Sequence, residues 1–306
     1  MGICRAGIGD AGSHNVTIFT TSIANAGWVF TRERRFRENR AHAALCDRDG
    51  REPVVKFRLK AFGLHVLASV CALSLLLVTL YFGWYQWPGW YLTGMAHITA
   101  ILGGVDVTLG PLITLLIANP RKPRRELARD IGIIATVQLV ALGYGALTLW
   151  NGRPLYYAYS GDRVETIQAG QLSGREVELA RQQNAPFAPH WDSRPRWVWA
   201  PMPKAPALQA QIIAQRHEKD GVDITQMPRV YQSWQAGLPE LRKQLKKIDQ
   251  LYIFSRIDKD VLKQRMQALG LPIDQANTMF LSGNGKPLLL VFDQRTLRLE
   301  AMLRCN

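Results

Sequence analysis

The sequence predicts a membrane protein in which three transmembrane α-helices precede a small α+β extracytoplasmic domain. Apolar residues are concentrated between Ala61 and Trp150, in three stretches of about 20 residues, the length of a helix that crosses a bilayer. That interval holds five Lys or Arg residues, all in one short loop. Residues 151–306 have instead the mixed composition of a soluble domain.

The formal net charge of +14 lies on both flanks of the apolar region. The flanks lack the interleaved Arg and aromatic residues that are typical of nucleic-acid modules. Nucleic acid is therefore not expected as a partner. The positive charge indicates membrane topology and affinity for anionic lipid instead.

Residues 1–55 form a basic, polar extension that we expect to be disordered. It contains five closely spaced arginines, Arg32, Arg34, Arg35, Arg37 and Arg40. The extension has no apolar segment followed by a small-residue cleavage site, so it is not predicted to be a secretory signal peptide. The alternative is a basic arm held at the membrane surface. We also expect the natural start to lie near Val54 or Val55.

The membrane module is expected over residues 56–150. Its helices are predicted at 61–82, 92–118 and 131–150. The turn at 83–91 has three tryptophans, two tyrosines and no charge, which is typical of an interfacial aromatic belt. A basic loop at 119–130 joins the second and third helices.

Basic residues predict the orientation of this module. Lys56, Arg58 and Lys60 precede the first helix, and the loop at 119–130 is also basic. Because Lys and Arg are retained on the cytoplasmic side, the N terminus is predicted to be cytoplasmic and residues 151–306 periplasmic. Four side chains of the loop are assigned to topology and contact with membrane lipid: Arg121, Lys122, Arg124 and Arg125.

The region after Trp150 is predicted to open with a hairpin. Aromatic and β-branched runs flank a Ser-Gly-Asp turn within residues 153–168. Ser173 has the position of a helix N-cap, with Glu176 at the capping-box position. Trp197 and Trp199 alternate as on a strand, where they serve either core packing or a peptide-binding face.

Further helices and strands complete the predicted domain. Helical patterns lie at 207–219, 239–249 and 259–269, the last ended by Gly270. Closing strands are expected at 279–282, 287–292 and 297–302. This order gives the α+β class.

Asp106 is the strongest single candidate for function, because an acidic side chain at membrane depth is costly. By residue count, Ser74 and Tyr144 lie at similar depth and are candidates to hydrogen-bond its carboxyl group. The side chain has three interpretations: a docking point for a partner helix, a carboxyl that locks the three helices together, or a proton-linked group. A proton relay needs several ionisable groups in sequence. We assign His65 to the membrane interface, and His97 lies roughly 13 Å from Asp106 along the helix, too far for contact.

Small residues surround this aspartate at Gly103, Gly104, Gly110 and Pro111. Glycine lets helices approach closely, and these positions also loosen or kink a helix. Together with Asp106, Ser74 and Tyr144, they form the predicted partner-binding face.

No catalytic, metal or cofactor site is predicted. The sequence lacks the nucleophile-elbow, zinc-protease and paired-cysteine motifs, so enzymatic activity has no positive support. The four cysteines have neither metal-ligand nor redox spacing. Cys305 would be an odd thiol outside the cytoplasm, where it either pairs between chains or stays free at a frayed end.

Three stretches of the sequence resemble a known family. They are RLKAFGLHVLAS at the first helix with the aromatic turn after it, ILGGVDVTLGPLITLLIANPRKP, and AYSGDRVETIQAGQL. They are similar to type IV pilin accessory proteins of the TfpX/TfpZ kind over residues 57–172, and the remainder is similar in size and layout. Residues 1–55 depart from the family, whose members usually begin just before the first helix.

The resemblance implies a bacterial inner-membrane protein that assists its cognate type IV pilin, with the pilus assembly machinery as a further partner. It implies no catalytic residue. The second hypothesis is a membrane-anchored sensor or ligand-binding protein, which lacks a cytoplasmic output domain. An integral-membrane enzyme ranks third, for want of a motif.

Overall fold

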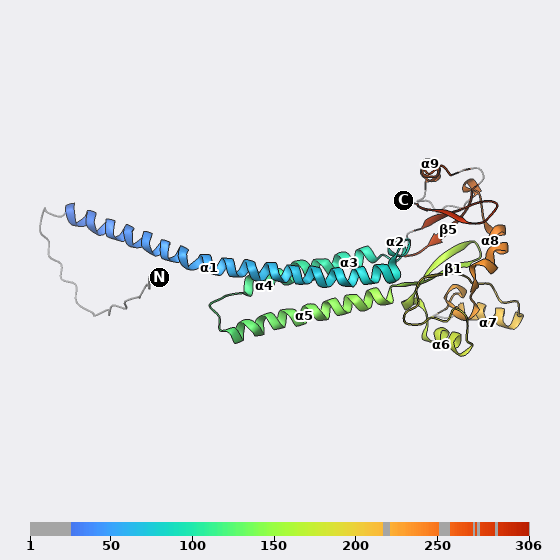
Figure 1. Ribbon diagram of the computed structural model, residues 1–306, viewed down its shortest axis with the longest axis horizontal. Coiled ribbons are helices and arrows are strands. Elements are labelled where there is room, and N and C mark those ends of the chain that lie inside the picture. The colour runs from blue at the N-terminus through green and yellow to red at the C-terminus, as the bar shows by residue number, and fades with distance from the viewer. Residues whose placement is uncertain are drawn as a thin grey trace. The chain divides into compact units, whose positions relative to one another are not determined.

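The computed structural model describes residues 26–216, 221–250, 258–271, 273, 276–284 and 287–305, with the backbone alone over residues 26–52. The chain divides into two units, Met1–Lys56 and Phe57–Asn306, which are treated separately. Figure 1 labels the α-helices and two of the strands.

The first unit contains the beginning of helix α1 (Ala26–Leu80). Residues 1–25 of the extension predicted to be disordered lie outside the described residues. From Ala26 onward the extension is helical. Ala, Arg and Glu are frequent in this stretch and are strong helix formers. The prediction of disorder was based on polarity and did not take this helix propensity into account.

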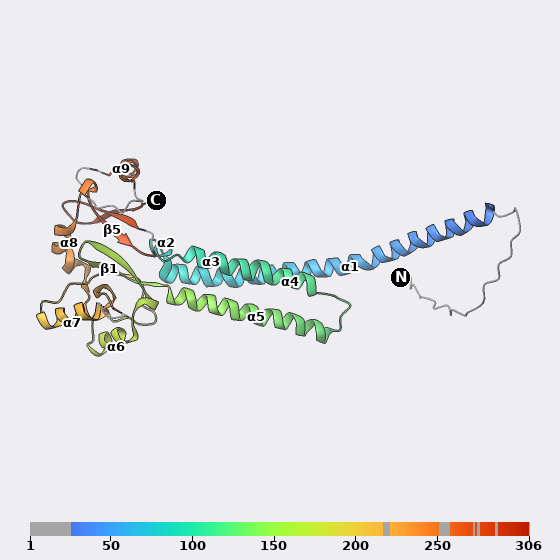
Figure 2. The same cartoon turned by 180° about the vertical axis from the view of Figure 1, so that it is seen from behind.

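Three helices in the described part of the chain are long and apolar enough to cross a membrane: Pro53–Tyr85, Met95–Ile117 and Arg124–Asn151. The first joins α1 to a π-helical turn, η1 (Tyr81–Tyr85). The other two lie alongside the second half of α1 in both side views (Figures 1 and 2). Arg58 at the far end of this bundle donates from Nε to the carbonyl of Ala118 at 2.8 Å.

A π-helical turn interrupts the second of these helices. Helix α3 (Met95–Gly103) passes into η2 (Gly104–Leu109) and then into α4 (Gly110–Ile117). The glycines at its ends fit the predicted weak points of the helix. The predicted continuous helix at 92–118 begins instead at Met95, because Gly94 has a φ of +75° and separates α3 from a short helix, α2 (Gly89–Leu92).

The third long helix, α5 (Arg124–Asn151), begins before the predicted residue 131. Pro123 stands at its N-cap and Glu126 in its first turn, where an acidic residue is favourable. The predicted basic loop at 119–130 is therefore too long, and Arg124 and Arg125 lie in the first turn of α5. Hydropathy marked the apolar part of the helix and missed its polar start.

Over its described residues, the C-terminal domain is built on a seven-stranded mixed sheet with the order β4-β3-β1-β2-β5-β6-β7. Its strands are β1 (Pro154–Ser160), β2 (Arg163–Gln168), β3 (Arg196–Trp199), β4 (Gln232–Ser233), β5 (Asn277–Ser282), β6 (Leu288–Phe292) and β7 (Leu299–Arg304). The predicted opening hairpin and closing strands are present. The parallel pairs β1–β3 and β2–β5 join the β1–β2 hairpin to the strands on either side of it, and they had no local signal in the sequence.

Both faces of the sheet are covered. On β6, Leu288, Leu290 and Phe292 point into one core and Leu289 and Val291 into another, as the two-residue period of a strand requires. The first core also takes in Tyr157 and Tyr159 of β1, together with Tyr91 and Leu92 from the turn between the first two long helices. That turn is thus part of the domain core.

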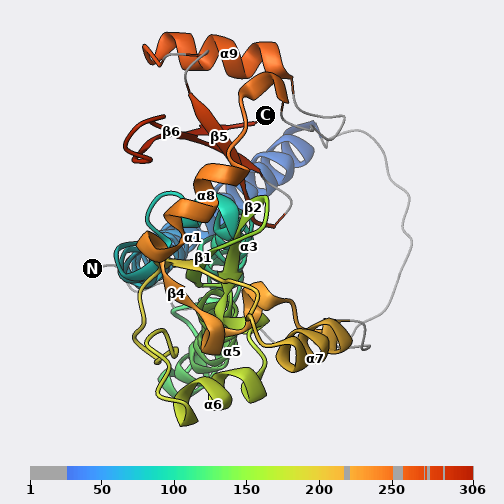
Figure 3. The same cartoon turned by 90° about the vertical axis from the view of Figure 1, so that its right-hand side faces the viewer.

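Short helices pack around the sheet (Figure 3). They are α6 (Gly174–Gln182), α7 (Pro206–Arg216), α8 (Leu238–Gln244) and α9 (Lys259–Ala268). Single 3-10 turns are η3 (Ala169–Gln171), η4 (Ile224–Gln226), η5 (Pro228–Val230), η6 (Trp234–Gly237) and η7 (Ile248–Gln250). Residues 217–219 of one predicted helix lie outside the described residues.

Ser173 caps α6 as predicted, by accepting from the backbone N–H of Glu176 at 3.2 Å. The Glu176 side chain does not complete the predicted capping box. It forms a buried ion pair with Arg229, whose Nε lies 2.8 Å from its carboxylate. A guanidinium is a stronger partner for a carboxylate than a backbone amide, so this tertiary contact replaces the local one.

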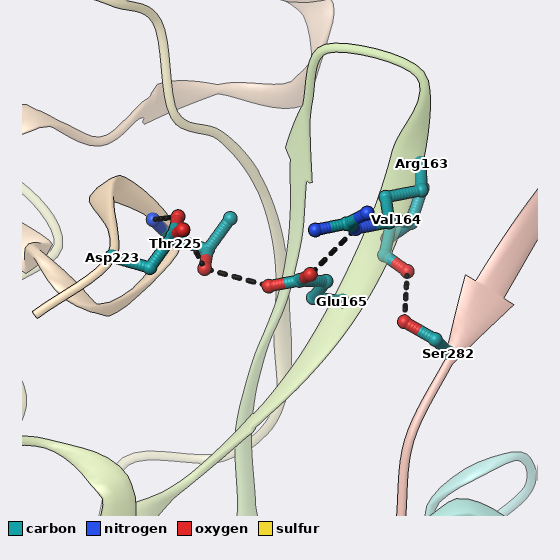
Figure 4. Close-up of polar contacts among 6 residues, drawn as sticks. All are labelled: Arg163, Val164, Glu165, Asp223, Thr225 and Ser282. Carbon is teal, nitrogen blue, oxygen red and sulfur yellow. Dashed lines mark hydrogen bonds and ion pairs between the residues drawn. The ribbon is translucent and has the colours of Figure 1, made fainter. Parts of the chain in front are cut away.

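Polar contacts also fix strand β2 (Figure 4). Glu165 accepts from Arg163 Nε at 2.6 Å and from the Thr225 hydroxyl at 2.8 Å. Asp223 accepts from the backbone N–H of Thr225 at 3.2 Å. On the neighbouring strand, Ser282 donates to the Val164 carbonyl at 3.4 Å. These contacts connect β2 with η4 and with β5.

The buried ion pair predicts a mutational effect. Arg229→Ala should lower the unfolding free energy by about 3 kcal/mol or more, because it leaves the Glu176 carboxylate buried without a cation. Chemical unfolding of the purified full-length protein, followed by circular dichroism, measures the effect. Lys243→Ala removes the exposed pair with Glu240 and should leave the midpoint unchanged. Equal midpoints for the two variants would contradict a stabilising role for the buried ion pair between Glu176 and Arg229.

Cys305 follows β7 and is buried with residues of α9, so it is not the frayed thiol that was one of the expectations. Burial raises the pKa of the Cys305 thiol to about 12. Since the thiolate is the reactive form, the folded protein should keep this thiol protonated and unreactive from neutral pH to pH 9.

In a chain that retains Cys305 as the single cysteine, we expect maleimide labelling to be at least tenfold slower in the folded state than in denaturant at pH 8. Mass spectrometry of quenched samples measures both rates. Equal rates in the two states would show that the thiol is accessible.

Candidate functional site

A chain of hydrogen bonds links the three long helices. His65 of α1 bonds through Nδ1 to the Thr114 hydroxyl of α4 at 2.6 Å and through Nε2 to the side-chain carbonyl of Gln138 on α5. The Gln138 amide donates in turn to the backbone carbonyl of Asp106 at 3.1 Å. Each long helix therefore supplies at least one residue to this chain of hydrogen bonds.

The partners of His65 satisfy both nitrogens of its ring. The Gln138 carbonyl only accepts, so His65 Nε2 donates to it. The Thr114 hydroxyl both donates and accepts, so it can pair with Nδ1 in either form of the ring. A satisfied group suits an apolar surrounding, in which an unpaired polar group is expensive.

The carboxyl group of Asp106 stands outside this chain. The residue is 4% exposed, and neither carboxylate oxygen has a hydrogen-bond partner among the described residues. It lies in the π-helical turn η2, whose wider backbone winding interrupts the α-helical register. The carboxyl group therefore keeps its full capacity to accept hydrogen bonds.

Neither predicted partner reaches that carboxyl group. Tyr144 is 74% exposed on the outside of α5, and Ser74 is exposed on α1. The residue of α5 that reaches Asp106 is Gln138, six positions or about 9 Å along the helix from Tyr144, so the residue count was wrong for Tyr144 in position as well as in face. His97, expected to be distant, is exposed on α3.

The predicted small residues have different surroundings. A Cβ on Gly110 would overlap the Gln138 side chain, whereas one on Gly104 would meet no atom within 4 Å. A Cβ on Gly103 would touch Leu73 at 3.8 Å. Pro111 is buried beside Gly110. Close helix approach thus depends on Gly110, and Gly104 faces open space.

Sequence reasoning missed the roles of His65 and Gln138. His65 was assigned to the interface by its distance from the helix end, and Gln138 was not singled out. A glutamine in the middle of an otherwise apolar stretch was the available signal, since such side chains hydrogen-bond across helices.

The basic residues at the other end of the bundle are exposed or paired. Lys122 forms an ion pair with Asp130 at 2.7 Å, and Arg121, Arg124 and Arg125 are exposed. Their assignment to topology and lipid contact remains a prediction.

An apolar groove lies where the first two long helices approach the C-terminal domain. Its volume is about 570 Å³. It is lined by Leu77, Val78, Tyr81, Phe82, Trp90, Met95, Ala96, Thr99 and Ala100. In the residues that the structure describes, His, Cys, Asp and Glu side chains form no group of three or more that suits a metal ion.

Fold and site together define a protein with three helices long enough for a membrane, a buried carboxyl group among them, and a sheet domain anchored on their connecting turn. Proteins from Dichelobacter nodosus are similar to it. The chain belongs to the family of fimbrial assembly proteins. A relative named for serogroups C1 and C2 is 30% identical to it over 124 residues, which are 95% of that relative and 40% of this chain.

Two longer relatives extend the similarity. The fimbrial assembly protein of serogroup I is 28% identical over 233 residues, which cover 74% of this chain and 87% of the relative. That of serogroup E1 is 26% identical over the same shares. No family model matches the chain. No solved structure matches it either.

The two glycines provide a matched test of the site. Gly110→Ala should lower the unfolding midpoint, because its Cβ displaces the Gln138 amide from the Asp106 carbonyl. Gly104→Ala should leave the midpoint unchanged or raise it, since alanine is favoured in helices by about 1 kcal/mol. Thermal unfolding of both variants in detergent gives the comparison. Shifts of the same sign would contradict the packing described here.

Proposed function

We propose that this protein is an inner-membrane accessory factor of the TfpX/TfpZ kind, which assists the stability, presentation or assembly of its cognate type IV pilin. The coarser role in fimbrial assembly follows from its family. The observation that carries the finer proposal is the buried carboxyl group of Asp106, which has no described partner within its own chain.

The proposed topology has a cytoplasmic N terminus and a periplasmic C-terminal domain. Arg121, Lys122, Arg124 and Arg125 lie between the second and third long helices, on the side to which the positive-inside rule assigns the cytoplasm. Three crossings then bring residues 151–306 to the periplasm, where a pilin exposes its globular part.

Asp106 supports contact with a partner helix. A buried polar group without a hydrogen bond costs free energy, and an acceptor at membrane depth can recover it from a donor on another helix. Gly104, two residues before Asp106 in the same helix, has open space beside it that would let such a helix approach. The proposed partner is the membrane helix of the pilin, with the C-terminal domain holding its head.

A sensor role is not favoured, because the relatives carry fimbrial assembly names. We propose no catalytic activity and no cofactor. The role needs binding surfaces alone, and the sequence holds no motif for chemistry.

The proposal predicts that Asp106→Asn lowers surface pilin while the variant itself accumulates normally. A hydrogen bond to a charged group contributes about 1.5 kcal/mol or more, which is roughly a tenfold change in binding. Surface and total pilin are measured by immunoblot in the native host, against a deletion strain and its complement.

Asp162→Asn is the matched control, because Asp162 is exposed in the turn between β1 and β2. It should assemble pili normally. Normal surface pilin with Asp106→Asn would remove this residue from the mechanism. Normal pilin in the deletion strain would refute the accessory role as a whole.

A further inference from the structure

The apolar groove beside the C-terminal domain is short. Its lining residues on the two helices fall within Leu77–Phe82 and Met95–Ala100. Each of these stretches is about 9 Å long at 1.5 Å per residue. A membrane-spanning helix is about 30 Å long, so a groove of this length contacts less than a third of one.

The outer wall of the groove faces the apolar phase. Val78 and Phe82 are exposed on the surface of the bundle, at a depth where lipid tails surround the helices. Thr99 carries the one polar side-chain group of the lining apart from the Tyr81 hydroxyl and Trp90 indole. A lipid tail fits both the length and the chemistry of this surface.

A cation stands at the end of the groove that adjoins the domain. The Arg304 guanidinium lies 5.4 Å from the ring centroid of Trp90, which lines the groove, and 5.4 and 4.9 Å from Trp87 and Tyr91. Arg304 is exposed, and within the described residues no carboxylate forms an ion pair with it. A guanidinium with open donors suits a phosphate group.

We propose that this groove is a binding site for an anionic phospholipid. One acyl chain occupies the space between α1 and α3, and the headgroup phosphate lies against Arg304 at the aromatic turn. The positive charge of Arg304 favours a net anionic headgroup over a zwitterionic one. The site is independent of the proposed contact with pilin.

Lipid retention by the purified full-length protein tests the proposal. The protein in neutral detergent is exchanged with equal amounts of phosphatidylglycerol and phosphatidylcholine, and bound lipid is counted by native mass spectrometry. We expect retention of phosphatidylglycerol severalfold above phosphatidylcholine. Ala96→Trp fills the groove and should reduce retention at least fivefold.

Headgroup recognition is tested separately. Arg304→Gln should bring the ratio of the two lipids close to one, while acyl-chain binding persists. Two controls are matched to these changes: Val140→Trp adds the same side chain on the exposed surface of α5, and Arg298→Gln removes a charge elsewhere on the domain. Both should behave as the wild type.

Photolabelling covers the case in which Ala96→Trp does not fold. A phosphatidylglycerol with a diazirine in its acyl chain should label residues 77–100 of the wild-type protein more strongly than the surface of α5. Uniform labelling, or equal retention by Ala96→Trp and Val140→Trp, would overturn the site. Displacement of all bound lipid by a synthetic apolar helix of the pilin would also overturn it, since the occupant would then be a protein.

Discussion

Burial of the aromatic turn within the C-terminal domain is the constraint on which the rest of the structure depends. Tyr91 and Leu92 lie in the same core as strands β1, β5 and β6. Trp84 donates from its indole to the Ser193 carbonyl at 2.7 Å, and Asn284 donates to the Thr93 carbonyl at 3.4 Å. The domain is therefore packed on the long helices and not joined to them by a flexible linker.

Among the long helices, some polar side chains have hydrogen-bond partners and others have none among the described residues. His65, Thr114 and Gln138 complete one another's hydrogen bonds, which supports a stable arrangement of the three long helices. The Asp106 carboxyl group receives no hydrogen bond from them. In the proposed function, stability and recognition thus depend on separate residues within one small region, so a substitution can change one and leave the other intact.

Features with a local signal were predictable from the sequence. Three apolar stretches, a Ser173 cap and a hairpin at 153–168 each follow from short-range physics. The parallel strand pairs and the Glu176–Arg229 ion pair were not predictable, because they join segments with no shared pattern. At the site, residue counting placed Ser74 and Tyr144 at the depth of Asp106. It could not assign the helix face, which depends on how the helices are rotated and on the register shift in η2.

The packing of Leu92 against the domain also bears on the order of folding. The Asn284–Thr93 hydrogen bond joins residues 191 positions apart, and contacts so distant in sequence are slow to form because the intervening chain must first be ordered. The turn is synthesised before any strand of the sheet, so it is already present when β1 and β2 pair beside it. Strands β5 to β7 are synthesised last and complete the core over it. In the proposed topology, insertion of the long helices fixes the turn at the membrane surface before the domain outside the membrane is complete.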